Sequence, residues 1–162
     1  MSKTFMMAFG IGLVCIAIAV AGIVYMQRGA KVDAEGKILK VRTLPLDENS
    51  SLAVLDFRIV NASDYPFMVR TVTVVMDQPS GDPMEGDTVS EPDAKRVFAS
   101  VPALGQKYND TLIMNDRMAP HASWDRMVAA RFSVPEDRLQ ARKRFIVRVE
   151  EVDGKVVDIN EK

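Results

Sequence analysis

The uncharged apolar stretch over residues 5–26 constrains this chain more than any other feature. Its sequence, FMMAFGIGLVCIAIAVAGIVYM, contains no charged residue and no Asn, Gln or Pro. A bilayer core about 30 Å thick needs roughly 20 apolar residues to be crossed by a helix. A lone segment can pair its backbone groups in lipid only as a helix. The sequence therefore predicts an N-terminal tail over residues 1–4 and a transmembrane helix over residues 5–26, which contacts the lipid bilayer.

Two kinds of processing are alternatives to a permanent membrane span. Residues 17–19 and 19–21 resemble signal-peptide cleavage sites of the A-x-A type. The apolar run continues through residues 22–26, which disfavours cleavage. A lipoprotein would use Cys15, but Val14 before it and the apolar residues after it are atypical of a lipidated cysteine.

Small residues recur four apart within the apolar stretch, with Ala8 and Gly12 as one pair and Ala17 and Ala21 as another. This spacing allows two membrane helices to approach closely. Weak self-association through the helix is therefore one interpretation. The other, which we prefer, is that small residues are common in membrane spans.

The flanks of the apolar stretch give conflicting indications of orientation. Lys3 precedes the stretch, whereas five basic residues follow it between Arg28 and Arg42. The positive-inside rule would place the following domain in the cytoplasm, but the rule weakens for long translocated domains. A short head before a span is also typical of a signal anchor. We expect residues 37–162 to lie outside the cytoplasm, in a periplasmic or extracellular position, joined to the span by a flexible tether over residues 27–36.

Composition excludes several classes of function for the domain. The net charge of −1 gives no general attraction to nucleic acid, and none is expected as a partner. The single cysteine, Cys15, lies in the apolar stretch, so the domain can hold neither a disulfide nor a cysteine metal cluster. Residues 37–162 suit one domain. No catalytic residue, cofactor or metal site is predicted.

The clearest strand is LAVLDFRIV, residues 52–60. Its odd-numbered residues are apolar, while Asp56 and Arg58 fall on the opposite face. Because successive side chains in a strand point to opposite faces, this pattern predicts a half-buried antiparallel strand. By the same argument we expect Phe57 to share one core with Phe132, while Arg58 and Arg131 face water.

Further strands are expected over 37–46 (ended by Pro45), 67–76, 124–134, 144–152 and 155–159, with a short one over 112–114. In the strand over 67–76, the predicted core face is Met68, Val72, Val74 and Met76. Turns are expected over 61–66, 120–123 and 153–154.

Residues 77–93 are predicted to form a loop, because they hold six acidic residues, no basic residue and several Pro and Gly. Ser90 is a candidate N-cap for a helix over 91–100 that ends before Pro102. A helical turn is expected over 135–141. Short alternating strands without a βαβ rhythm predict a mainly β fold. We expect an immunoglobulin-like antiparallel β-sandwich over 37–162, with one short inserted helix.

The strand pair LAVLDFRIVNASDYPFMVRTVTVVM resembles a signature of the late-embryogenesis-abundant type 2 family, also called the water-stress and hypersensitive-response domain. VAARFSVPEDRL resembles a later strand of that family, which ends in Val-Pro. The resemblance implies an immunoglobulin-like β-sandwich, no catalytic site and often one membrane anchor. The acidic loop and the helix around Val97 depart from the family pattern, and no functional residue carries over.

Three groups of residues are candidates for chemistry. In the acidic loop, Asp77, Asp82, Glu85 and Asp87 lack the ordered spacing of a calcium loop, so a solvated loop is expected. The only histidine, His121, lies between Pro and Ala, which is typical of a turn. The basic residues Arg138, Arg142, Lys143, Arg144 and Arg148 could meet anionic lipid, but acids among them favour a mixed-charge solvated face.

These observations predict a single-pass, membrane-anchored β-sandwich that serves as a non-catalytic binding or assembly module for a protein partner. Binding would use sheet edges or long loops. A small membrane-anchored hydrolase that uses His121 is the alternative, although no nucleophile elbow lies near it.

Overall fold

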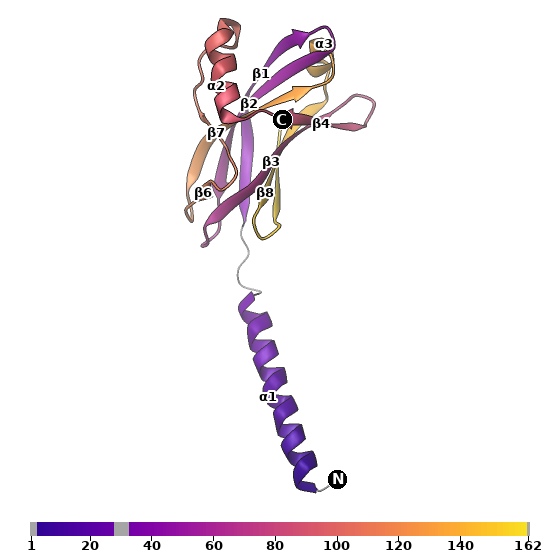
Figure 1. Ribbon diagram of the computed structural model, residues 1–162, viewed down its shortest axis with the longest axis vertical. Helices are drawn as coiled ribbons and strands as arrows, with labels where there is room; N and C mark the ends of the chain where they lie inside the picture. The colour runs from indigo at the N-terminus through magenta and orange to yellow at the C-terminus, as the bar shows by residue number, and fades with distance from the viewer. Residues whose placement is uncertain (1–2, 28–32, 162) are drawn as a thin grey trace. The chain divides into compact units, whose positions relative to one another are not determined.

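The computed structural model describes residues 3–27 and 33–161, which belong to two compact units, 1–31 and 32–162 (Figure 1). Residues 1–2 of the predicted tail and residues 28–32 of the predicted tether lie outside the described residues.

The first unit holds the helix α1, Lys3–Gln27. It covers the whole of the apolar stretch, which has no proline to interrupt it. Large apolar side chains between Phe9 and Ile23 are exposed. Among the described residues, no helix combines the length and the apolar character that crossing a membrane requires. A membrane-spanning role for residues 5–26 remains a prediction.

The second unit is mainly β, as predicted. Its strands are β1 (Ala34–Asp47), β2 (Ser50–Asn61), β3 (Phe67–Asp77), β4 (Pro83–Thr88), β5 (Asp110–Thr111), β6 (Arg117–Met118), β7 (Ser123–Phe132), β8 (Arg144–Glu151) and β9 (Val156–Asn160). They form a nine-stranded sheet in the order β1-β2-β7-β4-β3-β8-β9, with β5 beside β7 and β6 beside β3. All pairings are antiparallel except that of β5 with β7.

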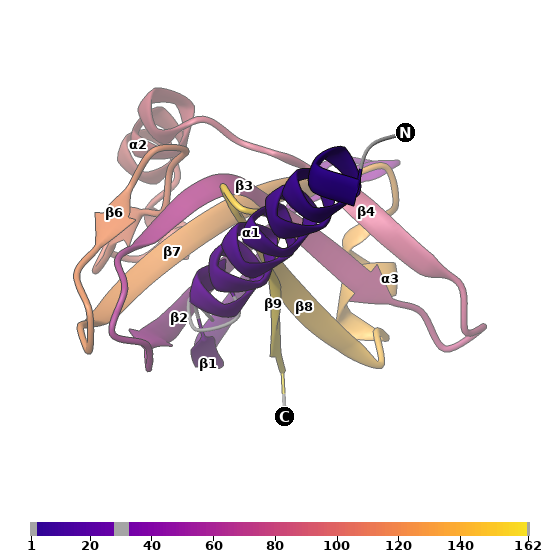
Figure 2. The ribbon, with the colours of Figure 1, turned by 90° about the horizontal axis from the view of Figure 1, so that it is seen from below.

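The expected two-layer immunoglobulin-like sandwich is not what forms. The strand β4 pairs with β3 through residues 83–86 and with β7 through residues 87–88, so it joins halves that a sandwich would keep separate. The joined sheet curls into a half-barrel (Figure 2). Its first and last strands approach closely, because a Cβ placed on Gly36 of β1 would lie 2.7 Å from Cδ1 of Ile159 in β9.

The main core fills the inside of the curl, where Phe57 and Phe132 belong to one buried cluster. Phe132 also packs against Phe145, with ring centroids 5.7 Å apart. Arg58 and Arg131 are exposed. The predicted register of β2 and β7 is therefore confirmed, although the core lies inside one curled sheet rather than between two sheets.

The prediction that β2 is half-buried is wrong, because both of its faces are covered. The helix α2, Glu91–Ser100, and the 3-10 turn η1, Pro102–Leu104, pack over its outer face. A second buried cluster forms there, with members Leu52, Val54, Ala94, Leu104, Met127 and Ala129. Asp56, expected to face water, is only 3% exposed.

Both predicted helical segments of the domain are present. The helix α2 has the predicted bounds, and Ser90 is its N-cap, whose side chain accepts a hydrogen bond from the backbone of Asp93. The segment over 135–141 contains the short helix α3, Glu136–Gln140.

Several predicted boundaries are wrong for identifiable reasons. The strand β1 begins at Ala34, inside the predicted tether, and continues past Pro45, which an edge strand tolerates. The strand β4 lies within the predicted loop over 77–93. The short strands near 112–114 are instead β5 and β6, which flank that position.

The core face of β3 also differs from the prediction. A register shift against β8 between Val69 and Thr71 marks a bulge at Arg70. A bulge adds one residue and changes which side chains share a face. Phe67 and Val69 therefore point into the core before the bulge, and Met68 does not belong to that core.

Candidate functional site

In the part of the chain that the structure describes, one stretch of β3 lacks a neighbouring strand on the side away from β8. On the side away from β8, β4 pairs with β3 only over Val74–Asp77, and β6 pairs only with Phe67 and Met68. Val69 bonds to the backbone of residues 115 and 116. Within the described chain, residues 70–73 are thus an open strand edge. Such edges are templates for pairing with another chain.

A groove of about 350 Å³ lies along this open edge. We call it the β3 groove. One wall is β3, one end is the junction of β4 with α2, and the other wall is β5 with the loop that follows it. Its lining consists of Arg70, Thr71, Val72, Thr88, Val89, Ser90, Glu91, Thr111, Leu112, Ile113 and Met114.

One residue of the lining has a buried hydroxyl without a hydrogen-bond partner among the described residues. Thr111 is 5% exposed, and its Oγ1 has no hydrogen-bond partner among the described residues. An unsatisfied buried polar group costs about 1–3 kcal/mol. Thr111 lines the groove, and its hydroxyl is covered in the free protein, so its side chain must rotate before a polar group bound in the groove can pair with it.

The rim of the groove is apolar and well anchored. Ile113 and Met114 are 43% and 65% exposed. Their loop is fixed by the bond from the Asn115 N–H to the carbonyl of Val69, 2.8 Å long, and by one from the Ile113 N–H to the Asp116 carboxylate, 3.1 Å long. Large apolar side chains held outward in this way are typical of contact surfaces.

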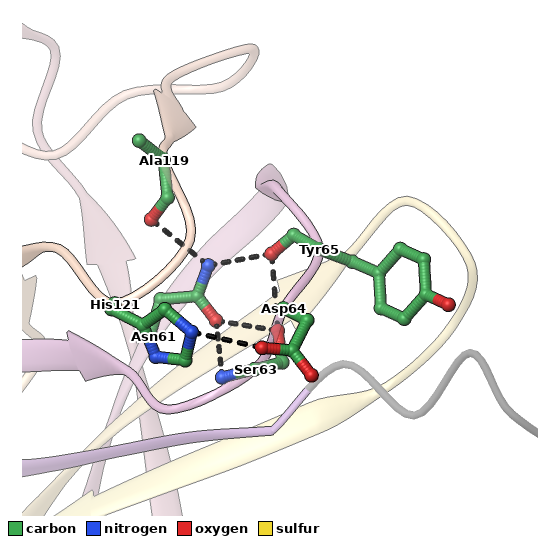
Figure 3. A network of polar contacts seen from close by, with 6 residues as sticks. All are labelled: Asn61, Ser63, Asp64, Tyr65, Ala119 and His121. Atoms are coloured by element: carbon green, nitrogen blue, oxygen red, sulfur yellow. Dashed lines mark hydrogen bonds and ion pairs between the residues drawn. The ribbon is translucent and has the colours of Figure 1, made fainter.

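The turn over 61–66, by contrast, has its polar groups satisfied (Figure 3). The buried side chain of Asn61 donates to the carbonyls of Tyr65 at 2.7 Å and Ala119 at 3.1 Å. Its Oδ1 accepts from the backbone and the hydroxyl of Ser63. This network ties the turn to the segment before β7, which is a structural role.

His121 lies beside this network, in a turn with φ of 56°. Its Nε2 is 2.9 Å from Oδ1 of Asp64, and both side chains are largely exposed (Figure 3). The hydroxyl of Ser63, the nearby serine in the network, donates to Asn61 rather than to His121. The geometry offers no serine–histidine pair at this turn, and the hydrolase alternative remains an untested prediction.

The basic residues at the end of the chain are distributed among ion pairs. Arg142 pairs with Glu161, while two others, Arg144 and Arg148, pair with Asp77 and Asp158 respectively. Burial by itself would raise the pKa of Glu161, but hydrogen bonds from Arg142 and the Phe145 N–H outweigh it and hold that pKa below its ordinary value. The arrangement matches the mixed-charge face more closely than a lipid-binding patch.

The acidic residues do not converge on a metal site. Asp77 is engaged by Arg144. Across the part of the chain that the structure describes, no group of three or more His, Cys, Asp or Glu side chains could hold a metal ion.

The sequence did not indicate the β3 groove. Thr111 lies in the stretch over 103–123, which shows no regular periodicity, and the hydroxyl of a threonine carries no signal of its pairing. The bulge at Arg70 and the turn of β4 from β3 to β7 create the open edge, and both depend on pairing between distant segments. The prediction that binding uses sheet edges is compatible with this edge but did not locate it.

Comparisons with protein families and with curated proteins found no match to this chain. One similar solved structure is the archaellum periplasmic stator protein FlaG from Sulfolobus acidocaldarius, with 12% identity, a TM-score of 0.37 and coverage of 79% of this chain and 99% of that chain. Another is the Northeast Structural Genomics Consortium target SoR45, with 10% identity, a TM-score of 0.34 and coverage of 82% and 81%. These scores assign no family or function, and no family match supports the resemblance to the late-embryogenesis-abundant type 2 family.

Proposed function

We propose that this protein is a membrane-anchored, non-catalytic binding or assembly module whose β domain docks a protein partner. The observation that carries the proposal is the β3 groove, where an open strand edge, an apolar rim and an unsatisfied buried hydroxyl lie together. Each of these features is costly or exposed in the free protein, and each gains from a bound protein segment.

The anchor in this proposal is residues 5–26. Support comes from the absence of charge over these residues and from the exposed apolar side chains of α1. A helix that is apolar all round needs an apolar environment. The domain lies outside the cytoplasm in this proposal, because a short head before a span is typical of a signal anchor. The positive-inside rule, which would place the domain inside, weakens for long translocated domains.

Orientation is tested with a single exposed cysteine. Ser80→Cys, in a Cys15→Ala background, places a thiol in the exposed loop between β3 and β4. A membrane-impermeant thiol reagent should label it in intact cells. Labelling only after lysis would place the domain in the cytoplasm.

Binding is tested by photo-crosslinking in intact membranes. A photoreactive amino acid is introduced singly at three exposed positions, Leu39, Tyr65 and Thr71, which lie on β1, in the turn before β3 and in the groove. A discrete protein adduct from at least one position supports a binding module. The absence of a discrete adduct from all three positions contradicts it.

A further inference from the structure

We infer that the β3 groove receives an extended, uncharged segment of the partner, which pairs with the backbone of Val72 and sets a polar side chain against the Thr111 hydroxyl. This inference rests on the proposed binding function and specifies the site and the chemistry of the bound segment.

The backbone of Val72 is oriented for such pairing. Its carbonyl accepts a hydrogen bond from the Thr88 hydroxyl, 3.1 Å away, on the groove side. The N–H and C=O of a strand residue point to the same edge, so the Val72 N–H also faces the groove. No strand of the described chain pairs with Val72 on that side. A bound strand can use this N–H directly and can share or replace the contact from Thr88.

The open strand edge selects an extended segment over a helix. An extended backbone can pair its N–H and C=O groups with those of an unpaired strand edge. The backbone groups of an α-helix are already bonded within the helix and are not available for such pairing. An extended segment can lie along residues 70–73 and insert one large side chain.

The charges around the groove favour an uncharged side chain. Glu91 is paired with Lys95 at 2.8 Å, and Arg70 is paired with Glu150 at 3.3 Å. Both charged residues of the lining therefore already have partners of opposite sign. Among the described residues, the Thr111 hydroxyl still lacks a hydrogen-bond partner, and it can both donate and accept. An amide or a phenol, carried on an apolar stem that packs against Ile113 and Met114, would supply that partner.

The test uses the full chain, labelled with ¹⁵N in detergent micelles. The probes are capped six-residue peptides that alternate valine and threonine around one central residue, which is glutamine, asparagine or tyrosine in turn. At millimolar concentration, at least one peptide should shift the Val72 amide resonance and slow its hydrogen exchange. The matched control is the same peptide with methylated backbone nitrogens at the central residue and its two neighbours. It loses strand hydrogen-bond donors, its methyl groups block close approach to the strand edge, and it should have no such effect.

Two variants test the individual contacts. Thr111→Val removes the hydroxyl at nearly constant volume and should weaken binding about three- to tenfold, the effect of one hydrogen bond. Thr88→Ala frees the Val72 carbonyl and should leave binding unchanged or tighten it.

The inference is overturned if no peptide slows exchange at Val72, if the methylated peptide binds equally well, or if Thr111→Val leaves affinity unchanged. Its failure is distinguishable from failure of the proposed function. If a partner crosslinks only at Tyr65 or Leu39, the protein is still a binding module, but the β3 groove is not its binding site.

Discussion

Arg42 of β1 and Asp56 of β2 form an ion pair across neighbouring strands, with Nη2 2.6 Å from Oδ2. Their side chains are 9% and 4% exposed. The same guanidinium donates to the carbonyls of Leu104 and Gln106, and Asn109 donates to the second oxygen of Asp56. The pair thus fastens η1 and the segment after it to the outer face of the sheet, which explains why Asp56 is buried.

Asp56→Ala should destabilise the domain by about 3–5 kcal/mol, because it leaves Arg42 buried without its carboxylate. Denaturant unfolding of the full chain in detergent measures the effect. The matched control is Arg58→Ala, also on β2, which removes an exposed pair with Asp125 of β7 and should cost far less. Adding Arg42→Met to Asp56→Ala should recover part of the loss. Equal losses from Asp56→Ala and Arg58→Ala would contradict a buried role for Asp56.

Gly86→Ala should destabilise the domain by about 1–3 kcal/mol, a typical cost of overpacking. A Cβ at Gly86 would lie 2.6 Å from Cζ of Phe132, so β4 can pass this close to the Phe132 ring only with a glycine at position 86. The control is Asp87→Ala, which changes the neighbouring, exposed residue of the same strand. Phe132→Leu, which shortens the ring side chain, should be less harmful in the Gly86→Ala background than alone. Strictly additive losses would show that the two positions are not in contact.

Some features of the domain can be predicted from the sequence alone, and others cannot. The alternation in residues 52–60 is a local property, and it correctly placed Phe57 inside and Arg58 outside. The cap around Ser90 is also local, and it correctly placed α2. The burial of Asp56 depends on Arg42 and Asn109, residues that only the folded chain brings to it.

The sheet topology was not predictable for a related reason. The loop assignment for residues 77–93 followed from their Pro and Gly content, yet Pro83 opens β4 and Gly86 makes room for Phe132. Long-range pairing overrides weak local preference in such a segment. The same pairing merges the halves of the expected sandwich and leaves residues 70–73 open.

Thr111→Val should leave the stability of the free protein unchanged or raise it. The hydroxyl that it removes has no partner among the residues that the structure describes, so no hydrogen bond is lost and a buried unsatisfied group disappears. Ser51→Ala is the contrasting variant, because the buried Ser51 hydroxyl donates to the carbonyl of Val134 at 2.6 Å. It should destabilise the domain by about 1–3 kcal/mol. Thermal unfolding compares the two, and a clear loss of stability in Thr111→Val would reveal a partner for its hydroxyl.

Stability should fall in acid partly through Glu161. Its pKa is lower in the folded protein than in the unfolded chain, so its carboxylate adds stability above the unfolded pKa. That contribution is lost as the pH falls through the lower, folded pKa. Glu161→Gln should therefore flatten the dependence of unfolding free energy on pH in this acid range. Arg142→Gln removes the main bonding partner and should flatten it similarly, whereas an unchanged slope in both variants would contradict the assignment.

The most direct test of a partner in the β3 groove is photo-crosslinking from Thr71 in intact membranes, performed with and without Thr111→Val in the same chain. The account predicts a discrete adduct, whose mapped attachment site lies in an extended, uncharged segment of the partner. The yield should drop with Thr111→Val and stay constant with Arg131→Ala, a change at an exposed residue outside the groove lining. An adduct yield that does not respond to Thr111→Val, or no adduct at Thr71, would contradict it.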